Sequence, residues 1–190
     1  MKTIAWDVDD TLNGLMRLWL EKSFLPRNKR CSVVYAGLTA NPPHKILGLS
    51  LAAYQRAYDA FRLSGCYDAL LPRKEVAAWF RRHGAKYRHI AVTAVPLPAA
   101  HKSAGWVYRH FGCWIRTFHV VPTPRAGQVL PRYDATKADF IRSIGGCDIF
   151  IDDNPENIRQ VKATGAGCLL VPAPWNEARG DIAALLRSIK

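Results

Sequence analysis

Short apolar runs alternate with helical patterns along most of this chain. Five such runs stand at residues 3–6, 89–92, 114–121, 148–151 and 167–171. The run at 114–121 is the least pure, because Arg116 and His119 interrupt it. Strands that are apolar on both faces are typical of a parallel sheet covered by helices on both sides. The runs therefore predict a parallel sheet.

The segments that follow these runs carry apolar residues at helical spacing and end at glycines or near prolines. They cover residues 73–83, 98–111, 136–144, 155–164 and 177–189. Strands that alternate with helices in this way build a doubly wound α/β fold. The predicted fold class is thus α/β, with a Rossmann-like parallel sheet.

Residues 14–72 break this rhythm. Two helices are expected there, at 15–24 and 50–63, with a loop between them that contains Pro42 and Pro43. No strong signal for a parallel strand occurs in this stretch, so an insertion after the first strand is the simplest explanation. We expect a core made of residues 1–13 and 73–190, and a small, mainly helical cap made of residues 14–72.

Composition and charge narrow the class of protein. The chain has 190 residues, 49% of them hydrophobic and 22% charged, which suits one globular core. The five cysteines show no C-x-x-C spacing, which argues against a zinc site. No apolar run reaches the roughly 18 residues of a membrane span, and early aspartates exclude a signal peptide, so a cytoplasmic protein without a membrane partner is predicted.

The net charge of +12 favours anionic partners such as phosphorylated metabolites, nucleotides or nucleic acid. The basic residues are spread along the chain, which is more typical of a solvated surface than of a groove for nucleic acid. A small phosphorylated substrate is therefore the favoured partner.

Acidic residues follow two of the predicted strands. Asp7 and Asp9 follow the first run, and Asp152 and Asp153 follow the fourth. Ligands of open α/β sheets bind beyond the carboxyl ends of the strands, where these side chains would meet. Carboxylates this close repel each other unless a cation neutralises them, and their hard oxygen atoms suit Mg²⁺. The alternative, a helix cap formed by the first cluster, does not account for Asp7 at the end of a buried strand.

Lys137 is the candidate cation for a bound phosphate. It stands at the start of a predicted helix, where the helix dipole favours anions rather than cations. The alternatives are that Lys137 is merely exposed, or that Lys102, in the body of another helix, fills this role.

Four motifs resemble those of the haloacid dehalogenase (HAD) superfamily. The segment 7–12, Asp-Val-Asp-Asp-Thr-Leu, is similar to the first motif, D-x-D-x-T after an apolar strand. Thr93 ends an apolar run as in the second motif, and Lys137 fits the third. The Asp152-Asp153 pair after an apolar run resembles the fourth. All four occur in the order typical of that superfamily.

This resemblance implies roles for the acidic residues and a Mg²⁺ cofactor. Asp7 would be the nucleophile and a metal ligand. Asp9 would be the general acid and base, with its backbone carbonyl on the metal. Asp152 would bind the metal directly, and Asp153 would act through water or by anchoring Lys137.

The remaining roles concern the phosphoryl group and the first loop. Thr93 and Lys137 would hold the phosphoryl oxygens, as could the backbone amides of Val8, Asp9 and Ala94. Thr11 would steady the loop.

The 5′(3′)-deoxyribonucleotidase-like subgroup is the most similar one. Its supports are the small helical cap, the paired acids and a late turn at residues 174–176. Within the cap, Leu51, Tyr54, Tyr58 and Phe61 follow helical spacing. They would form either a packed apolar face or an aromatic wall that stacks a nucleobase.

The sequence therefore predicts a Mg²⁺-dependent phosphomonoester hydrolase that forms an aspartyl-phosphate and acts on a (deoxy)nucleotide or another small phosphorylated metabolite. One alternative is a phosphatase for the 3′ or 5′ ends of polynucleotides. The other is a HAD-fold binding protein without turnover. A phosphotransferase could use the same residues.

Overall fold

The computed structural model describes residues 1–189 and contains one parallel sheet with the strand order β3-β2-β1-β4-β5. The strands are β1 (Thr3–Trp6), β2 (Arg88–Val95), β3 (Ile115–Pro122), β4 (Ile149–Asp152) and β5 (Gly167–Leu170). All five predicted strands are confirmed, and β2 runs past Thr93 instead of ending there. The predicted α/β class with a parallel sheet is confirmed as well.

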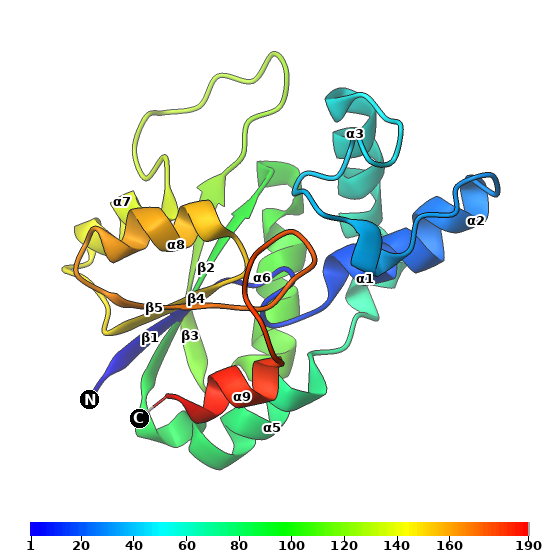
Figure 1. Ribbon diagram of the computed structural model, residues 1–190. Helices are drawn as coiled ribbons and strands as arrows, with labels where there is room; N and C mark the ends of the chain where they lie inside the picture. Colours follow the sequence, from blue (N-terminus) through cyan, green and yellow to red (C-terminus); the bar gives the residue numbers. More distant parts are fainter. Residues whose placement is uncertain (190) are drawn as a thin grey trace.

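The sheet is covered on both faces (Figure 1). The central strand β1 shows why, because Ile4 and Trp6 belong to one buried cluster and Ala5 to the other. One cluster contains residues of α5 (Lys74–His83), α6 (Leu97–Phe111) and α9 (Ile182–Arg187). The opposite cluster contains residues of α7 (Lys137–Ser143) and α8 (Pro155–Lys162). The period of two along each strand thus supplies apolar side chains to both helix layers.

The last helix is shorter than the sequence predicts. The helix α9 begins at Ile182 because Asp181 accepts a bond from the Ala184 amide, at 2.6 Å, as a helix cap. Gly180 just before it has φ = 88°, a left-handed conformation that a helix cannot include. Residues 177–181 are therefore not helical, although the sequence predicts the first helical turns there.

Residues 14–72 carry helices and, within this described stretch, no strand. The elements are α1 (Leu15–Trp19), the π-helical turn η1 (Leu20–Phe24), α2 (Leu25–Arg27), η2 (Tyr35–Gly37), α3 (Leu51–Arg62) and α4 (Gly65–Asp68). In Figure 1, α1, α2 and α3 lie together beside the sheet. Trp19 joins α1 to α3, because its ring contacts the rings of Tyr54 and Tyr58 edge-on, with ring centroids 5.5 and 5.2 Å apart. We refer to residues 14–72 below as the inserted segment.

No helix among the described residues is both long enough and apolar enough to cross a membrane.

A buried histidine joins β1 to β2. The Trp6 indole donates to Nδ1 of His89 at 3.0 Å, and Nε2 of His89 lies 2.9 Å from the Gly84 carbonyl. Since an indole can only donate, Nδ1 must accept, and Nε2 carries the single proton of a neutral ring. Burial lowers the pKa of His89, although its bond to Gly84 partly opposes this shift.

This neutral histidine makes stability depend on pH. Below the ordinary histidine pKa of about 6.5, the unfolded chain binds a proton that folded His89 resists. The free energy of unfolding should therefore be full above that pH and fall as the pH decreases toward the lowered folded pKa. Urea unfolding at pH 7.5, 6.5 and 5.5 measures this slope, which His89→Gln should reduce. His101→Gln, on an exposed position of α6, should keep the wild-type slope, and equal slopes in all three proteins would contradict the assignment.

Candidate active site

A pocket of about 220 Å³ lies at the carboxyl ends of β1, β2 and β4. Seven of the predicted site residues line it, namely Asp7, Asp9, Thr93, Ala94, Lys137, Asp152 and Asp153. The topology explains this convergence, because β1 is the middle strand and has β2 and β4 as its direct neighbours. The ends of three parallel strands thus bring residues from distant parts of the chain to one place.

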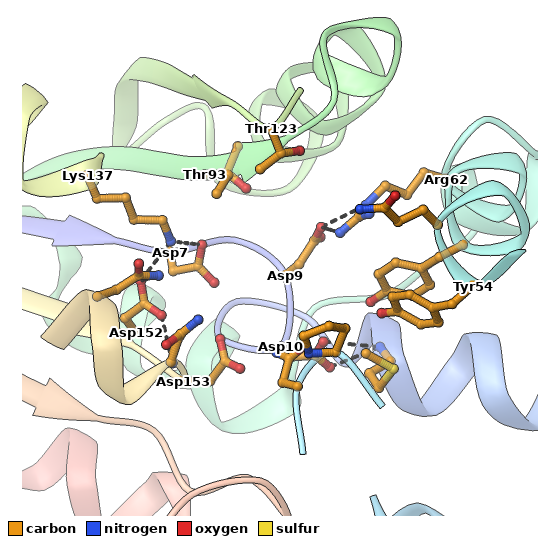
Figure 2. A pocket seen from close by; sticks show the side chains of 18 of the residues that line it. Asp7, Asp9, Asp10, Tyr54, Arg62, Thr93, Thr123, Lys137, Asp152 and Asp153 are labelled. Carbon is orange, nitrogen blue, oxygen red and sulfur yellow. Dashed lines mark hydrogen bonds and ion pairs between the residues drawn. The ribbon is translucent and has the colours of Figure 1, made fainter. Parts of the chain in front are cut away.

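Lys137 lies between two of the carboxylates (Figure 2). Its Nζ forms ion pairs with Oδ1 of Asp7 and with Oδ2 of Asp152, the latter at 2.7 Å. The helix α7 that carries Lys137 is fixed by a capping box, in which Thr136 and Asp139 bond each other's backbone amides. Burial lowers the pKa of Lys137, but Asp152 and Asp7 outweigh burial and raise it above the ordinary value. Lys137 is therefore a buried lysine whose charged form is stabilised by two carboxylates.

The other lysine considered for binding phosphate, Lys102, forms an ion pair outside the pocket. Lys102 pairs with Asp68 at 2.6 Å and does not line the pocket. Of the two lysines that the sequence offers, Lys137 is the one in the candidate site.

Asp152 and Asp153 are held by different partners. Asp152 accepts bonds from the Asn154 amide at 2.8 Å and from the Asn157 side chain at 3.0 Å. The Asp153 carboxylate accepts the Trp175 indole N–H at 2.8 Å. Lys137 bonds to Asp7 and Asp152, so the role of Asp153, through water or by anchoring Lys137, stays a prediction. Successive residues at a strand end point in different directions, which explains why the two acids have different partners.

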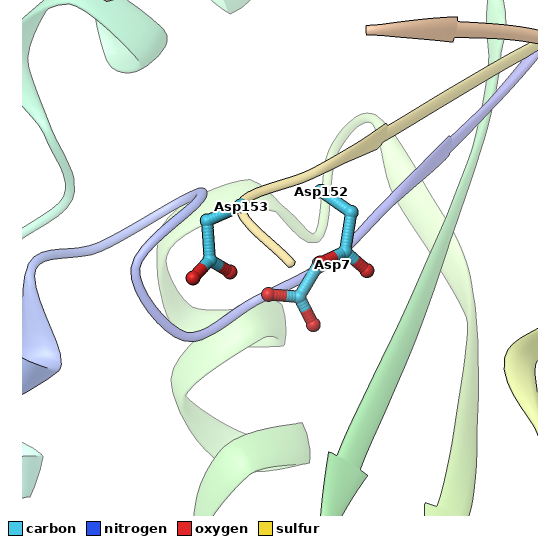
Figure 3. Close-up of side chains that lie close together, drawn as sticks. All are labelled: Asp7, Asp152 and Asp153. Carbon is cyan, nitrogen blue, oxygen red and sulfur yellow. The ribbon is translucent and has the colours of Figure 1, made fainter. Parts of the chain in front are cut away.

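Three of the carboxylates could hold a metal ion. One oxygen each of Asp7, Asp152 and Asp153 lies within 4.8 Å of the others, and all three residues are buried (Figure 3). Burial, together with neighbouring carboxylates, raises the pKa of Asp7 and of Asp153 well above the ordinary range. Lys137 supplies one positive charge to three buried acids, so the cluster lacks positive charge. A hard divalent cation such as Mg²⁺ fits this set of oxygen donors.

Asp9 points away from this cluster. Its Oδ2 accepts bonds from Nε and Nη2 of Arg62 at 3.2 and 3.0 Å. Its Oδ1 lies 3.2 Å from the Asn13 side-chain nitrogen and 3.4 Å from the Tyr67 hydroxyl. Figure 2 shows the side chain turned toward Arg62 on the inserted segment. Both carboxylate oxygens are therefore engaged on the side opposite Asp7.

The loop after β1 is closed by backbone bonds and by bonds from the Asn13 and Arg73 side chains. The amides of Leu12 and Asn13 both donate to the Val8 carbonyl, at 2.9 and 3.2 Å. The Thr11 hydroxyl is buried and has no hydrogen-bond partner among the described residues, so its role in steadying the loop stays a prediction.

Asp10 is a pocket residue that the sequence did not single out. Both of its oxygens accept from the Met16 amide, at 3.0 and 3.2 Å, which ties the loop to the start of α1. Its backbone has φ = 63°, which aspartate tolerates better than most residues. Burial, with the neighbouring Asp9 and Asp7 carboxylates, raises the pKa of Asp10 to about 7.

Two arginines were also missed. Arg62 is 8% exposed, and its guanidinium lies 4.2 Å from the centre of the Tyr58 ring. Arg125, in the loop after β3, forms two bonds with Asp59 of α3, at 2.7 and 2.8 Å. One signal for Arg62 was present, since it falls four residues after Tyr58 on the buried face of its helix. No local pattern marks Arg125.

The tyrosines on one face of α3 pack against neighbouring side chains instead of facing the pocket with their rings free. Tyr54 and Tyr58 stack on each other at 5.4 Å, and Arg62 covers the Tyr58 ring. Both tyrosines are 5% exposed, and the Tyr54 hydroxyl points toward the pocket (Figure 2). Leu51 is 44% exposed and stands outside this packing. The geometry favours the packed face over the base-stacking wall.

The comparisons with known proteins rest on structure. No family model matches the chain, and no curated protein matches its sequence. A haloacid dehalogenase-like hydrolase from Streptococcus pneumoniae is 12% identical, with 98% of this chain and 90% of that chain covered and a TM-score of 0.58. A proposed phosphoglycolate phosphatase from Lactobacillus delbrueckii subsp. bulgaricus is 12% identical, with 100% and 99% covered and a TM-score of 0.60.

A third similar structure carries a different name. Protein Tyrosine Kinase A from Mycobacterium tuberculosis is 16% identical, with 95% of this chain and 87% of that chain covered and a TM-score of 0.59. At these identities the likeness shows that the chain has the fold of HAD-like hydrolases. The activity must be argued from the site, because one fold supports several activities.

Proposed function

We propose that this protein is a Mg²⁺-dependent phosphomonoester hydrolase of the HAD superfamily. The observation that carries the proposal is the arrangement of Asp7, Lys137 and Asp152 at the ends of β1 and β4, with Thr93 across the same pocket. The HAD-like fold and the names of its structural neighbours agree with a hydrolase. Deoxyribonucleotidase-like specificity rests on the sequence resemblance alone.

The proposed reaction starts at Asp7. A carboxylate oxygen of Asp7 attacks the phosphorus, the bond to the leaving oxygen breaks, and Asp9 gives that oxygen a proton. Asp9 then takes a proton from the water that attacks the aspartyl-phosphate, which releases phosphate and restores Asp7. For both steps, Asp9 must leave Arg62 and turn toward Asp7.

The other residues hold charge and exclude water. Lys137 and the Thr93 hydroxyl bind phosphoryl oxygens, and the buried site strengthens these interactions. Asp7, Asp152 and Asp153, with the Asp9 backbone carbonyl, are the candidates to hold Mg²⁺. A bound Mg²⁺ would neutralise the acids and the phosphate charge. The inserted segment acts as a cap that closes one side of the pocket.

A panel of phosphomonoesters tests the proposal. It should contain deoxyribonucleotides, ribonucleotides, sugar phosphates, small carboxylated esters and a 3′-phosphorylated oligonucleotide, each with Mg²⁺ and with EDTA. Release of phosphate that requires Mg²⁺ supports the proposal. If no member reacts, the non-catalytic alternative gains weight, and preference for the oligonucleotide would favour the alternative that acts on polynucleotide ends.

The bond from Trp175 to Asp153 gives a prediction about metal affinity. Trp175→Phe removes the indole N–H that orients Asp153. Loss of such an outer partner lowers metal affinity about 10-fold to 100-fold, so the Mg²⁺ concentration for half-maximal activity should rise by about that factor. Trp114→Phe, at the opposite end of the sheet, is the control and should leave this concentration unchanged. Equal Mg²⁺ requirements in both variants would show that the bond from Trp175 does not support metal binding by Asp153.

A further inference from the structure

Two arginines, each paired with an aspartate, lie at the end of the pocket opposite the carboxylate cluster. Figure 2 shows Arg62 reaching from α3 toward Asp9, on the far side of the pocket from Asp7 and Lys137. The side chain of Arg62 is 10% exposed, and three of its N–H groups contact Asp9 and Asp59. Its flat face rests on the Tyr58 ring at 4.2 Å, which fixes the plane of the guanidinium. Arg62 is thus a buried and preorganised donor.

A second arginine adjoins it. Arg125 bonds both oxygens of Asp59, and Arg62 lies 3.5 Å from one of those oxygens. Two guanidinium groups therefore share one carboxylate at this end of the pocket. The lining residues Tyr54 and Gln55 add a hydroxyl and an amide. These groups can all donate hydrogen bonds to an oxygen-rich ligand.

The contact between Arg62 and Asp9 indicates where an anionic group of a ligand could bind. Asp9 accepts two N–H groups of Arg62 in the geometry that guanidinium also offers to a ligand carboxylate or phosphate. Asp9 belongs to the β1 loop and Arg62 to the inserted segment, so no rigid element joins them. A substrate oxyanion at this place would replace Asp9 as the partner of Arg62.

We propose that Arg62, with Arg125 beside it, selects phosphoesters whose leaving group carries a second anionic group, a carboxylate or a phosphate. This inference rests on the proposed function and specifies its substrate class. Such an ester fits the two arginines that line this end of the pocket. The covered faces of Tyr54 and Tyr58 agree with such a ligand better than with a stacked base.

Matched esters test the proposal by kinetics. Phosphoglycolate is compared with isobutyl phosphate, which has the same shape without the carboxylate, and ethylene glycol bisphosphate represents the second phosphate. Wild-type protein should show kcat/KM at least about 10-fold higher for one acidic ester than for isobutyl phosphate. The preferred acidic ester identifies the carboxylate or the phosphate as the second group.

Substitutions at Arg62 should remove this preference. Arg62→Gln should bring the ratio close to one, chiefly by raising KM for the acidic ester, and Arg62→Lys should give an intermediate ratio because it keeps the charge but not the fork. Arg56→Gln changes the same charge at an exposed position of α3 and should keep the wild-type ratio. If wild type shows no preference, or Arg62→Gln slows both esters equally, the proposal is wrong.

Binding separates this inference from the proposed function. Calorimetry on Asp7→Asn measures the affinity for phosphoglycolate, the bisphosphate and isobutyl phosphate without turnover. If wild type releases no phosphate from any ester, the hydrolase proposal fails, and the binding preference alone decides the role of Arg62. An at least 10-fold preference for an acidic ester that Arg62→Gln abolishes in the Asp7→Asn protein supports that role, and equal affinities overturn it.

Discussion

Replacing Asp7 by Asn should reduce phosphate release at least about 10⁴-fold, because an amide cannot form the phosphoryl-enzyme bond. The fold should remain intact. Asp7 is 5% exposed, and burial and neighbouring acids raise its pKa well above the ordinary range. Without metal, its negative charge therefore destabilises the folded state. An uncharged side chain of the same shape removes this destabilisation. The melting temperature in EDTA should therefore be equal to or higher than that of wild type.

Phosphate release and the melting temperature, measured together, make this test specific. Asp68→Asn makes the same change of side chain at a site that pairs with Lys102, outside the pocket, and should retain full activity. Trapping of a phosphoryl group on wild type, but not on Asp7→Asn, would identify the acceptor. Wild-type turnover by Asp7→Asn would show that the nucleophile is another group, and loss of folding would show that Asp7 is structural.

Removal of the metal should abolish activity, as removal of the nucleophile does, but it should also lower stability. The cluster of Asp7, Asp152 and Asp153 has one lysine for three buried acids, so EDTA should abolish phosphate release and lower the melting temperature. Mg²⁺ binds the folded state alone and should restore both. If activity persists in EDTA, the site works without a divalent cation.

Much of the fold could be predicted from local patterns. The strand β4 is an example, since an apolar run before paired acids in an α/β chain predicts a buried parallel strand that ends at those acids. The helix α3 was equally clear, because Ser50 caps it and apolar residues follow at helical spacing. The helix α9 was predicted too long, because Gly180 just before it has a left-handed backbone conformation, which hydrophobic periodicity does not report.

In the candidate site, too, some features follow from the sequence and others do not. Asp7 and Asp152 end neighbouring strands, so their proximity follows from topology and needs no knowledge of loops. The direction of the Asp9 side chain does not follow, because Arg62 reaches it from a helix 53 residues away in the chain. The pairing of Arg125 with Asp59 is equally non-local, since 66 residues separate them. Long-range contacts between a loop and an inserted helix leave no periodic trace in the sequence.

Replacing Lys137 by Met should have the second large effect, and it should appear in stability as well as activity. Lys137 is 3% exposed and pairs with Asp7 and Asp152, which are themselves buried. Removing one partner of a buried ion pair leaves uncompensated charge and costs about 3–5 kcal/mol. Loss of a donor that stabilises developing phosphoryl charge should lower kcat about 10²-fold to 10³-fold.

The dependence of this deficit on pH and Mg²⁺ distinguishes charge from packing. Asp7 already has a raised pKa in the folded state, so its charged form destabilises the protein as the pH rises through that value. Without Lys137, the loss of unfolding free energy in EDTA should therefore be larger at pH 8 than at pH 5. Mg²⁺ should recover more stability in Lys137→Met than in wild type, because it supplies the missing positive charge.

Lys102→Met provides the matched control for this change. Lys102 forms its ion pair with Asp68 where both side chains are partly exposed, and such pairs contribute at most about 1 kcal/mol. Its stability should show little dependence on Mg²⁺, and its activity should stay at the wild-type level. A Lys137→Met deficit that is equal at both pH values and insensitive to Mg²⁺ would mean that Lys137 serves packing, and the electrostatic account of the site would then be wrong.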